Sequence, residues 1–395
     1  MTTTYLDHAA STPLRPEVLE QMLPYLTDEQ ANPSSPHGPG RRARKAMDEA
    51  HERLARAVGA QPRELVFTSG GTESINLAVK GAAWAGKARG HRLVTSAVEH
   101  KAVLESCQHL ERFGFAISHV PVDRYGRLDA DALTAAIDER VVLVSLQWAN
   151  NEVGTIQPIA ELIARVRAVS EALVHVDAVQ AAAYLPLDVH ALGADLVSLA
   201  AHKLEGPKGV GALWIRRSVA ILPQLHGGSQ ERYRRAGTED VAGAVGMAAA
   251  FELAAAEREQ VVPRLRDHRD RLAEGLRGVA GLELTGHPVE RLPGLLSAIL
   301  PDLVGDELVM ALDLEGIACS TGSACTTGSS EPSHVLAAMA YPAAEARGSL
   351  RLSLGRTTRD TDVDQAARTI PQVVARLRRG QSQLGTTVAV GEGTP

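Results

Sequence analysis

Short apolar runs rich in β-branched residues alternate with amphipathic segments between residues 40 and 250. The runs predict strands at 64–69, 92–97, 116–122, 141–147, 173–179, 196–200 and 209–216. The segments between them that have a helical spacing include 42–58, 73–85, 102–113 and 159–172. Near-continuously apolar strands that alternate with helices are typical of a mostly parallel sheet covered on both faces. The sequence therefore predicts an α/β domain whose ligand site lies beyond the carboxyl ends of the strands.

The hydrophobic pattern changes after residue 250. A long helical stretch at 251–278 leads into short apolar runs at 283–285, 297–300 and 350–354, which predict a smaller α+β domain. We therefore expect a large domain over 15–255 and a small domain formed by 1–14 and 256–379. The segment 380–395 is rich in Gly, Ser and Thr and only weakly apolar, so we expect a mobile tail there.

Composition and charge narrow the class of protein. The 395 residues, 45% of them hydrophobic, are enough for a large core, and a net charge of −6 without long basic runs gives no sign of a nucleic-acid surface. Three cysteines make no disulfide framework and fit a reducing compartment. No run approaches the roughly 20 apolar residues that cross a bilayer, and the first residues lack the basic-then-apolar design of a secretion signal. We expect a soluble cytoplasmic protein that contacts neither membrane nor nucleic acid.

Polar residues stand directly after several expected strands, at the edge where a ligand site is expected. In chain order they are the turn Gly71–Thr72, then His100, Asn150–Asn151, Asp177 and His202–Lys203. Taken singly, most have an ordinary explanation, since such turns cap helices, a lone His is usually structural and neighbouring Asn residues form turns. The Asp and the Lys are different, because burying either charge without a partner is costly.

One cofactor accounts for these residues together. Pyridoxal 5′-phosphate (PLP) needs a lysine that bonds to its aldehyde, an acid beside its pyridinium nitrogen, donors for its phosphate and a group that stacks on its ring. Lys203, Asp177, the Gly71–Thr72 turn and His100 supply these functions in turn. Glycine lets the backbone approach a ligand, and the free N–H groups of a helix start favour an anion. Their occurrence at successive strand ends of one sheet favours a PLP site over separate structural roles.

Cys325 stands in a run of small polar residues at 320–330. Such a run buries little surface, so we expect an exposed, mobile loop that carries function. Cys107 and Cys319 have apolar neighbours and are expected to be core residues. A free thiol has a pKa of about 8.5, so Cys325 must lose its proton to react well, and His100 is a candidate partner in that step. The alternative is an incidental surface thiol.

Short motifs extend from residue 5 to residue 356: YLD at 5–7, NPSS at 32–35, SGGTES at 69–74, EHKAV at 99–103, NNEVG at 150–154, HVDAVQ at 175–180, AHKLEGPKGVGAL at 201–213, HGGSQE at 226–231, RAGTEDV at 235–241, GSAC at 322–325 and LRLSLGR at 350–356. Together they resemble the cysteine desulfurases, within the class V aminotransferase group of fold-type I PLP enzymes, and are most similar to the housekeeping iron–sulfur-cluster type. The resemblance implies the PLP-dependent transferase fold of type I and the removal of sulfur from L-cysteine, leaving L-alanine.

The resemblance also implies roles for individual residues toward the cofactor. The residues that it assigns to cofactor binding are Gly71, Thr72, His100, Asn151, Asp177, Gln180, His202, Lys203 and Thr238. Among them, Lys203 would bond to the cofactor, Asp177 would hold the ring nitrogen and Gln180 the ring hydroxyl. Gly71, Thr72 and His202 would hold the phosphate, and Thr238 would come from the second subunit of a homodimer. His100 would stack on the ring and exchange protons.

For the substrate, the resemblance implies that Arg351 and Asn151 clamp the carboxylate and that Cys325 carries the persulfide. A guanidinium suits a carboxylate because it donates two parallel hydrogen bonds. Lys203 would remove the α-proton of the substrate. Ala200 is a departure, because the family often has a phosphate-binding Ser there; one phosphate hydrogen bond would then be missing.

Two other functions are compatible with part of this pattern. An aminotransferase or selenocysteine lyase of the same fold would keep Lys203 and Asp177 but has no need for a thiol in a flexible loop. A catalytically inactive sulfur-relay scaffold would have no need for Lys203. The sulfur acceptor stays open: iron–sulfur scaffolds, tRNA thiolation proteins and DNA-sulfur-modification proteins are all served by relatives.

Overall fold

The computed structural model describes residues 3–322 and 332–389, with side chains as far as residue 380. It divides into two compact units, a larger one of residues 11–151 and 155–259 and a smaller one formed by the rest. The domain limits that we expect from the sequence, 15–255 against 1–14 with 256–379, remain predictions. Among the described residues, no helix is long and apolar enough to cross a membrane.

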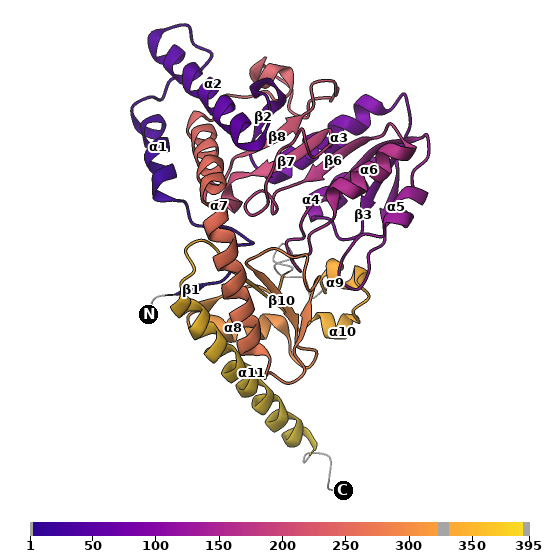
Figure 1. Cartoon of the computed structure of the whole chain (residues 1–395), viewed down its shortest axis with the longest axis vertical. Coiled ribbons are helices and arrows are strands. Elements are labelled where there is room, and N and C mark those ends of the chain that lie inside the picture. Colours follow the sequence, from indigo (N-terminus) through magenta and orange to yellow (C-terminus); the bar gives the residue numbers. More distant parts are fainter. Residues whose placement is uncertain (1–2, 323–331, 390–395) are drawn as a thin grey trace. The chain divides into compact units, whose positions relative to one another are not determined.

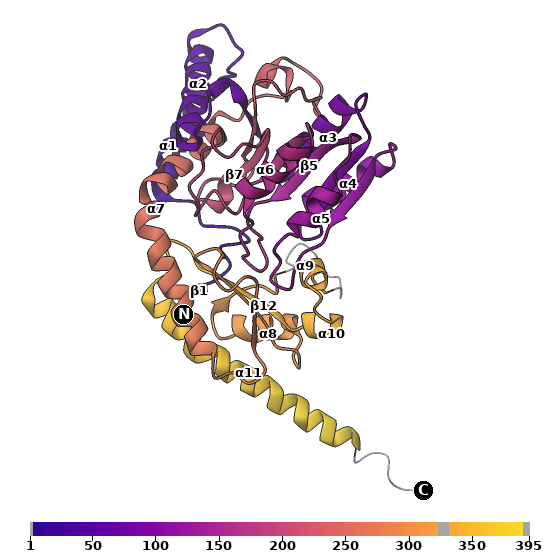
Figure 2. The same cartoon turned by 45° about the vertical axis from the view of Figure 1, so that its right-hand side comes forward.

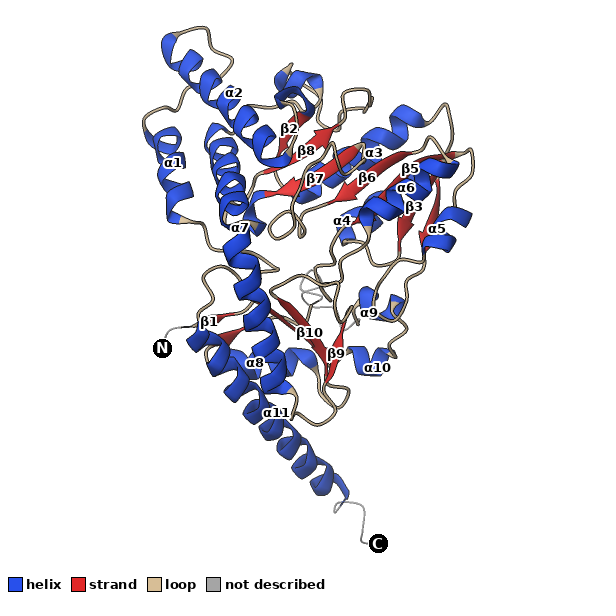
Figure 3. Cartoon of the chain, in the orientation of Figure 1, coloured by secondary structure: helices blue, strands red, loops and turns tan. Residues whose placement is uncertain are grey.

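The larger unit is built on a seven-stranded sheet, which confirms the expected α/β fold (Figures 1 and 3). In chain order its strands are β2 (Leu65–Thr68), β3 (Arg92–Ser96), β4 (Ala116–Val120), β5 (Val141–Gln147), β6 (Leu173–Asp177), β7 (Leu196–Ala200) and β8 (Gly211–Ile215). In space their order is β2-β8-β7-β6-β5-β3-β4. Only β8 is antiparallel to its neighbours, so all the other strands of this sheet run the same way. Their carboxyl ends therefore lie along one edge of the sheet.

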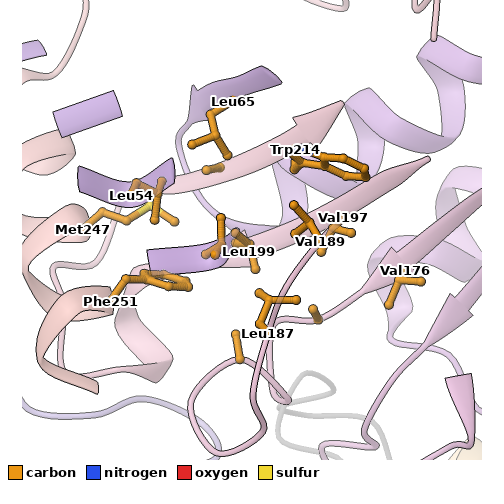
Figure 4. Packing of buried hydrophobic residues seen from close by; sticks show 14 of the residues in the cluster. Leu54, Leu65, Val176, Leu187, Val189, Val197, Leu199, Trp214, Met247 and Phe251 are labelled. Atoms are coloured by element: carbon orange, nitrogen blue, oxygen red, sulfur yellow. The ribbon is translucent and has the colours of Figure 1, made fainter. Parts of the chain in front are cut away.

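Helices cover both faces of this sheet. Alternate strand residues point to opposite faces, so that Leu65 and Trp214 belong to one buried cluster and Val66 and Leu213 to another. The first cluster, shown in part in Figure 4, involves helices α2 (Gly38–Val58), α6 (Ile159–Val169) and α7 (Val241–Leu276). The second involves α3 (Gly71–Gly86) and α4 (Lys101–Glu111). The remaining helices of this unit are α1 (Pro16–Thr27), α5 (Ala130–Ala135) and the short 3-10 turns η1 (Pro62–Glu64), η2 (Ala201–Lys203) and η3 (Gln230–Tyr233).

Helix α3 follows strand β2 through a turn that requires glycine. Gly70 precedes the helix with a φ of 145°, in a region that residues with a side chain rarely adopt. The turn leaves the first backbone N–H groups of α3 at the carboxyl end of β2. This arrangement suits an anion at that edge of the sheet.

The smaller unit has an antiparallel three-stranded sheet in the order β12-β10-β9. Its strands are β9 (Glu283–Thr285), β10 (Leu295–Ile299) and β12 (Ser349–Ser353), and a separate parallel pair joins β1 (Thr4–Tyr5) to β11 (Ile317–Ala318). The helices are α8 (Gly305–Asp313), α9 (His334–Ala338), α10 (Ala343–Ala346) and α11 (Asp360–Ala389), which Figure 2 shows as one long helix near the C-terminus. Isolated bridges join Asp7 to Ser353 and Ser320 to Arg351, so the start of the chain and the segment before residue 323 both lie beside β12.

Two helices are longer than the sequence predicts. Helix α7 begins at Val241 rather than at 251, because the segment 241–250 is rich in Ala and Gly and buried throughout, so no polar face reveals its helical period. Helix α11 continues to Ala389, whereas we expect a mobile tail from residue 380. Once a helix has formed, each further residue adds a hydrogen bond, and no proline interrupts the helix after Pro371.

Candidate active site

The structure brings the carboxyl ends of β2, β3, β5, β6 and β7 to one edge of the larger unit. Ladder pairing places Asp177 beside Gln147 of β5 and beside Ser198 of β7. The expected cofactor residues leave these strands at that edge: Gly71 and Thr72 after β2, His100 after β3, Asn151 after β5, Asp177 and Gln180 at β6, and His202 and Lys203 after β7. The edge therefore gathers residue types that serve the different parts of one cofactor.

Asp177 ends strand β6 with its carboxylate buried. Its Oδ1 accepts a hydrogen bond of 3.0 Å from the N–H of Val179. Burial raises the pKa of Asp177 to about 6, although this hydrogen bond and the positive charge of Lys203 both act to lower it. A desolvated acid is stabilised by a cationic partner, and the protonated ring nitrogen of PLP is such a partner. The carboxylate therefore fits the cofactor.

Replacing Asp177 by Asn should stabilise the protein stripped of its cofactor. The unfolded carboxyl has a pKa of about 3.9, so between about pH 4 and pH 6 the folded state retains a proton that the unfolded state has lost. The wild type therefore loses stability as the pH rises through that window, and the variant does not. We expect the variant to be more stable at pH 7.5 by on the order of 1–3 kcal/mol, part of the gain being offset because Lys203 loses its partner.

Urea unfolding of both proteins at pH 7.5 and at pH 4 measures this difference, which should vanish at pH 4. The holoenzyme variant should turn over at least about a hundredfold more slowly, because a neutral amide no longer favours a protonated ring nitrogen. Equal stabilities at pH 7.5 together with normal turnover would mean that Asp177 is an ordinary structural residue.

His175 supports the end of β6, and the sequence analysis did not identify it. Its Nδ1 lies 2.8 Å from Oγ of Ser145 on β5, and its Nε2 lies 2.8 Å from Oγ of Ser198 on β7. Burial lowers the pKa of His175 to about 3, so the ring is neutral. The ring therefore joins three neighbouring strands just before Asp177 and fixes where that carboxylate stands.

His100 has a definite hydrogen-bonding state. It is the N-cap of helix α4, and its Nδ1 accepts a hydrogen bond of 3.0 Å from the N–H of Ala102. Since Nδ1 provides a lone pair to this cap, the proton of the neutral ring is on Nε2. While the cap is intact, His100 can donate a proton from Nε2 and cannot accept one there.

The turn after β2 and the end of β7 form the part of the edge that suits a phosphate. A Cβ built on Gly71 would lie 3.0 Å from Cγ2 of Val179 and 3.5 Å from Cβ of Ala200, so the backbone of the turn packs closely against the segment after β6 and against the end of β7. Burial, followed by the charges of neighbouring lysines, lowers the pKa of His202 to about 4. The neutral ring of His202 would therefore hold a phosphate by hydrogen bonding, and Ala200 offers no hydroxyl.

Lys203 ends the short turn η2 that follows strand β7. The backbone before it is fixed, because the carbonyl oxygen of His202 accepts hydrogen bonds from the N–H of Thr12 at 3.0 Å and from its hydroxyl at 2.7 Å. The charge of Lys203 acts on the carboxyl of Asp177. An amine and a desolvated carboxylate are thus held at adjacent strand ends, as a cofactor with an aldehyde and a ring nitrogen requires.

The two asparagines after β5 differ in their surroundings. Asn150 is buried and donates from Nδ2 to the carbonyl of Val98 at 2.9 Å and to Oε1 of Gln147 at 3.1 Å, which is a structural role. Asn151 is half-buried, and its Oδ1 accepts from Nε2 of Gln147 at 3.2 Å. Gln180 is buried after the end of β6. The roles of Asn151 and Gln180 toward a cofactor remain predictions.

Thr238 and Arg351 are not on this edge of the larger unit's sheet. Thr238 is exposed on the segment between η3 and α7, so its expected role depends on a second subunit. Arg351 belongs to strand β12 of the smaller unit and is almost fully buried. Its Nη2 donates to Oδ1 of Asp7 at 2.8 Å and its Nη1 to the carbonyl of Gly322 at 3.2 Å, so an acid and a carbonyl orient the guanidinium.

Comparison with known proteins identifies the family. The family model described as aminotransferase class-V matches residues 4–366. This chain belongs to that family. It is 48% identical to "Cysteine desulfurase IscS" of Methanosarcina thermophila over 95% of this chain and 92% of that protein. It is 50% identical to "IscS-like cysteine desulfurase" of Mycobacterium tuberculosis over 95% and 97% of the two chains.

A solved structure described as "NIFS-LIKE PROTEIN" superposes with a TM-score of 0.90 at 37% identity, covering 95% of this chain and all of that one. The resemblance inferred from the motifs is therefore confirmed, and so is the fold class. Class V aminotransferases of this kind depend on PLP, which the buried acid, the lysine and the glycine turn at the sheet edge are suited to hold. The family and its similar structures therefore also confirm the enzyme class and the cofactor that the sequence predicts.

Two of the three cysteines, Cys107 and Cys319, lie in the part of the chain that the structure describes. Cys325 lies in 323–331, outside the described residues, so its role as persulfide carrier remains a prediction. Cys107 is buried as expected, whereas Cys319 is half-buried rather than a full core residue, because it lies just beyond the two-residue strand β11. Burial raises the pKa of both thiols to about 12, so both stay protonated near neutral pH. Neither described cysteine has the thiolate that a nucleophile requires.

Glu99 is a second buried group that the sequence analysis did not identify as part of the site. Its Oε1 accepts hydrogen bonds from the hydroxyl of Ser96 at 2.7 Å and from the N–H of Gln147 at 2.8 Å. Burial, with a smaller contribution from the charge of Asp177, raises its pKa to about 8. The signal for this group in the sequence was an acidic residue that stands directly before His100 and shortly after an apolar strand.

Proposed function

We propose that this enzyme takes sulfur from free L-cysteine onto its own Cys325 and leaves L-alanine. Its cysteine desulfurase activity follows from relatives of 40–50% identity that carry that name over almost the whole chain. The observation that supports this proposal best is that the desolvated carboxyl of Asp177 and the charge of Lys203, which acts on it, stand at the ends of the adjacent strands β6 and β7.

We assign binding and proton transfer to different residues. When bound, PLP withdraws electrons from the substrate through its ring, and the negative charge of Asp177 keeps the ring nitrogen protonated. The amine of Lys203 removes the α-proton of the substrate and returns a proton later. His100, with its proton on Nε2, donates a hydrogen bond and shields one face of the site. Asn151 and Arg351 bind the substrate carboxylate, Arg351 through the fork of its guanidinium.

Cys325 accepts the sulfur. Its thiolate attacks the sulfur of the substrate, a sulfur–sulfur bond forms, and the carbon–sulfur bond of the substrate breaks. The electron pair of the broken bond stays with the substrate carbon, which takes up a proton and becomes the methyl group of alanine. Enzyme thiol and cysteine thus give enzyme persulfide and alanine, and the reaction needs no external oxidant.

An aminotransferase of the same family is the second candidate function, since Lys203 and Asp177 would serve it equally. The purified holoenzyme is to be incubated with L-cysteine and no oxo acid, and alanine is to be quantified over many turnovers in the presence of a reducing thiol. A desulfurase makes alanine continuously under these conditions. An aminotransferase makes no alanine from cysteine: it releases the oxo acid of cysteine once, with the sulfur retained, and then stops because it needs an amino-group acceptor to regenerate its cofactor.

The enzyme should be a homodimer in which Thr238 contributes to the site of the second subunit. Thr238 is exposed on its own chain, and a hydroxyl donor that hydrogen-bonds a phosphate contributes about 1–3 kcal/mol. Light scattering should give twice the chain mass, and Thr238→Ala should bind PLP about tenfold more weakly, measured by loss of the cofactor on dialysis.

Thr134→Ala is the control, because that hydroxyl bonds to the carbonyl of Ala130 within α5. A monomeric mass with full activity at the same concentration would refute the shared site. We also propose a cytoplasmic location and a protein sulfur acceptor, either an iron–sulfur scaffold or a thiolation enzyme; co-purification from the native cell would identify it.

A further inference from the structure

Three side-chain amides at the end of strand β5 form a hydrogen-bonded row. Nδ2 of Asn150 donates to Oε1 of Gln147 at 3.1 Å, and Nε2 of Gln147 donates to Oδ1 of Asn151 at 3.2 Å. Gln147 therefore links the buried Asn150 to the half-buried Asn151. Gln147 lies outside every motif that indicated the cofactor site.

The direction of this row is fixed at its first member. Nδ2 of Asn150 also donates to the main-chain carbonyl of Val98 at 2.9 Å. A carbonyl oxygen only accepts, so the nitrogen of the Asn150 amide must face Val98, and the same nitrogen faces Gln147. The atom of Gln147 that receives this hydrogen bond is then its oxygen, which turns the nitrogen of Gln147 toward Asn151.

The main chain of Gln147 is held in place as well. Its N–H donates to Oε1 of the buried Glu99 at 2.8 Å, and its ladder partner on β6 is Asp177. The N–H of Trp148 donates to the carbonyl of Asp177 at 2.9 Å. Gln147 is 5% exposed, so water has little access to its hydrogen bonds. The amide that faces Asn151 therefore projects from a fixed point beside Asp177.

We propose that Gln147 is a positioning residue that makes the side chain of Asn151 a hydrogen-bond donor toward the carboxylate of the substrate. The NH2 group of Gln147 occupies the oxygen of Asn151, so the amide nitrogen of Asn151 is turned away from Gln147. A carboxylate only accepts hydrogen bonds, and the nitrogen is the end of an amide that can bind it. Reversing the amide of Asn151 would set two NH2 groups against each other and present its oxygen to the substrate.

The inference deepens the proposed function and rests on the assignment of Asn151 to the substrate carboxylate. Gln147→Met keeps the length of the side chain and removes both of its hydrogen bonds. Kd for L-cysteine should rise at least about fivefold, since binding must then also orient the amide of Asn151. Kd for cysteamine, which is cysteine without the carboxylate, should stay within about twofold of the wild-type value.

Both dissociation constants are to be measured by titrating the absorbance of the bound cofactor in the holoenzyme, a readout that does not depend on turnover. The titrations are repeated in Asn151→Ala and in the double variant. If Gln147 acts through Asn151, replacing Gln147 has no further effect once residue 151 is alanine. A residue that only supports the fold would weaken binding to the same extent in both backgrounds.

Gln157→Met is the matched control. Gln157 is another buried glutamine of the larger unit, and its amide accepts from the N–H of Leu128 at 3.0 Å and donates to the carbonyl of Gly126 at 2.6 Å. This variant should lose stability to urea much as Gln147→Met does, yet keep the wild-type Kd for both ligands. Gln147→Asn, whose amide is one methylene shorter and loses its contact with Asn151, should show the same weakening for L-cysteine even where Gln147→Met fails to fold.

A wild-type Kd for L-cysteine in Gln147→Met would overturn the inference, and so would an equal loss of affinity with and without the side chain of Asn151. Either result leaves the proposed function intact. If Asn151→Ala binds L-cysteine as the wild type does, the assignment of Asn151 is wrong and the inference falls with it. The proposed function fails separately, if the wild-type holoenzyme forms no alanine from L-cysteine, whatever the titrations of Gln147→Met show.

Discussion

Replacing Lys203 by alanine should lower the rate of alanine formation from cysteine by a factor of at least about a thousand. The variant loses the amine to which we assign both the bond to the cofactor and the removal of the α-proton, and no other described lysine stands at the end of β7. The fold should survive, since the side chain of Lys203 is only half-buried and the backbone there is held by Thr12. Steady-state kinetics and urea unfolding measure the two effects.

Adding a small amine to Lys203→Ala tests whether the amine of Lys203 acts by moving a proton. If Lys203 acts by moving a proton, added methylamine should restore part of the activity of Lys203→Ala in proportion to its concentration. Lys87→Ala is the control, because Lys87 is exposed after helix α3 and donates to the carbonyl of Phe113. Normal turnover by pure Lys203→Ala without added amine would show that another group performs this step.

Cys325→Ser should bind PLP and show the normal spectral response to cysteine, yet release sulfur at least about a thousandfold more slowly. Neither cofactor binding nor substrate binding needs the thiol, whereas a hydroxyl is a far poorer nucleophile toward sulfur than a thiolate. Sulfide release in the presence of a reducing thiol measures the loss, and absorption spectra confirm that the cofactor is bound.

The two other cysteines provide the comparison. Cys319→Ser and Cys107→Ser should keep their activity, because burial raises the pKa of both thiols to about 12 and leaves almost no thiolate near neutral pH. Cys319 is the closer competitor, only six residues before Cys325 in the sequence. Loss of sulfur release in Cys319→Ser with full activity in Cys325→Ser would reverse the assignment.

The strands of the large sheet were predictable because a parallel sheet buries both faces of each strand. Val141–Gln147 and Leu196–Ala200 have the bounds that the sequence indicates. The run 209–216 is longer than strand β8, Gly211–Ile215, because glycine and arginine at its ends are compatible with strand and turn alike. The start of α7 was not predictable, since a helix buried on all sides shows no amphipathic period.

The positions of Asp177 at the end of β6 and of Lys203 just after β7 were predictable, because each follows an apolar run in the sequence. Hydrogen bonds between residues far apart in the chain were not predictable. Glu152 and Ser333 are 181 residues apart and Asp7 and Arg351 are 344 apart, and nothing local in the sequence indicates either bond. The tautomer of His100 likewise follows from its place at the start of α4, which only the structure gives.

The most direct test of the central claim is a single turnover of the wild-type holoenzyme with one equivalent of L-cysteine and no reducing thiol. Peptide mass spectrometry locates the sulfur, and alanine is quantified in the same sample. We expect the added mass of one sulfur atom on the peptide that contains Cys325, in equal amount to the alanine formed. Alanine without an adduct on Cys325, or an adduct on Cys319 while Cys325 is unmodified, would contradict it.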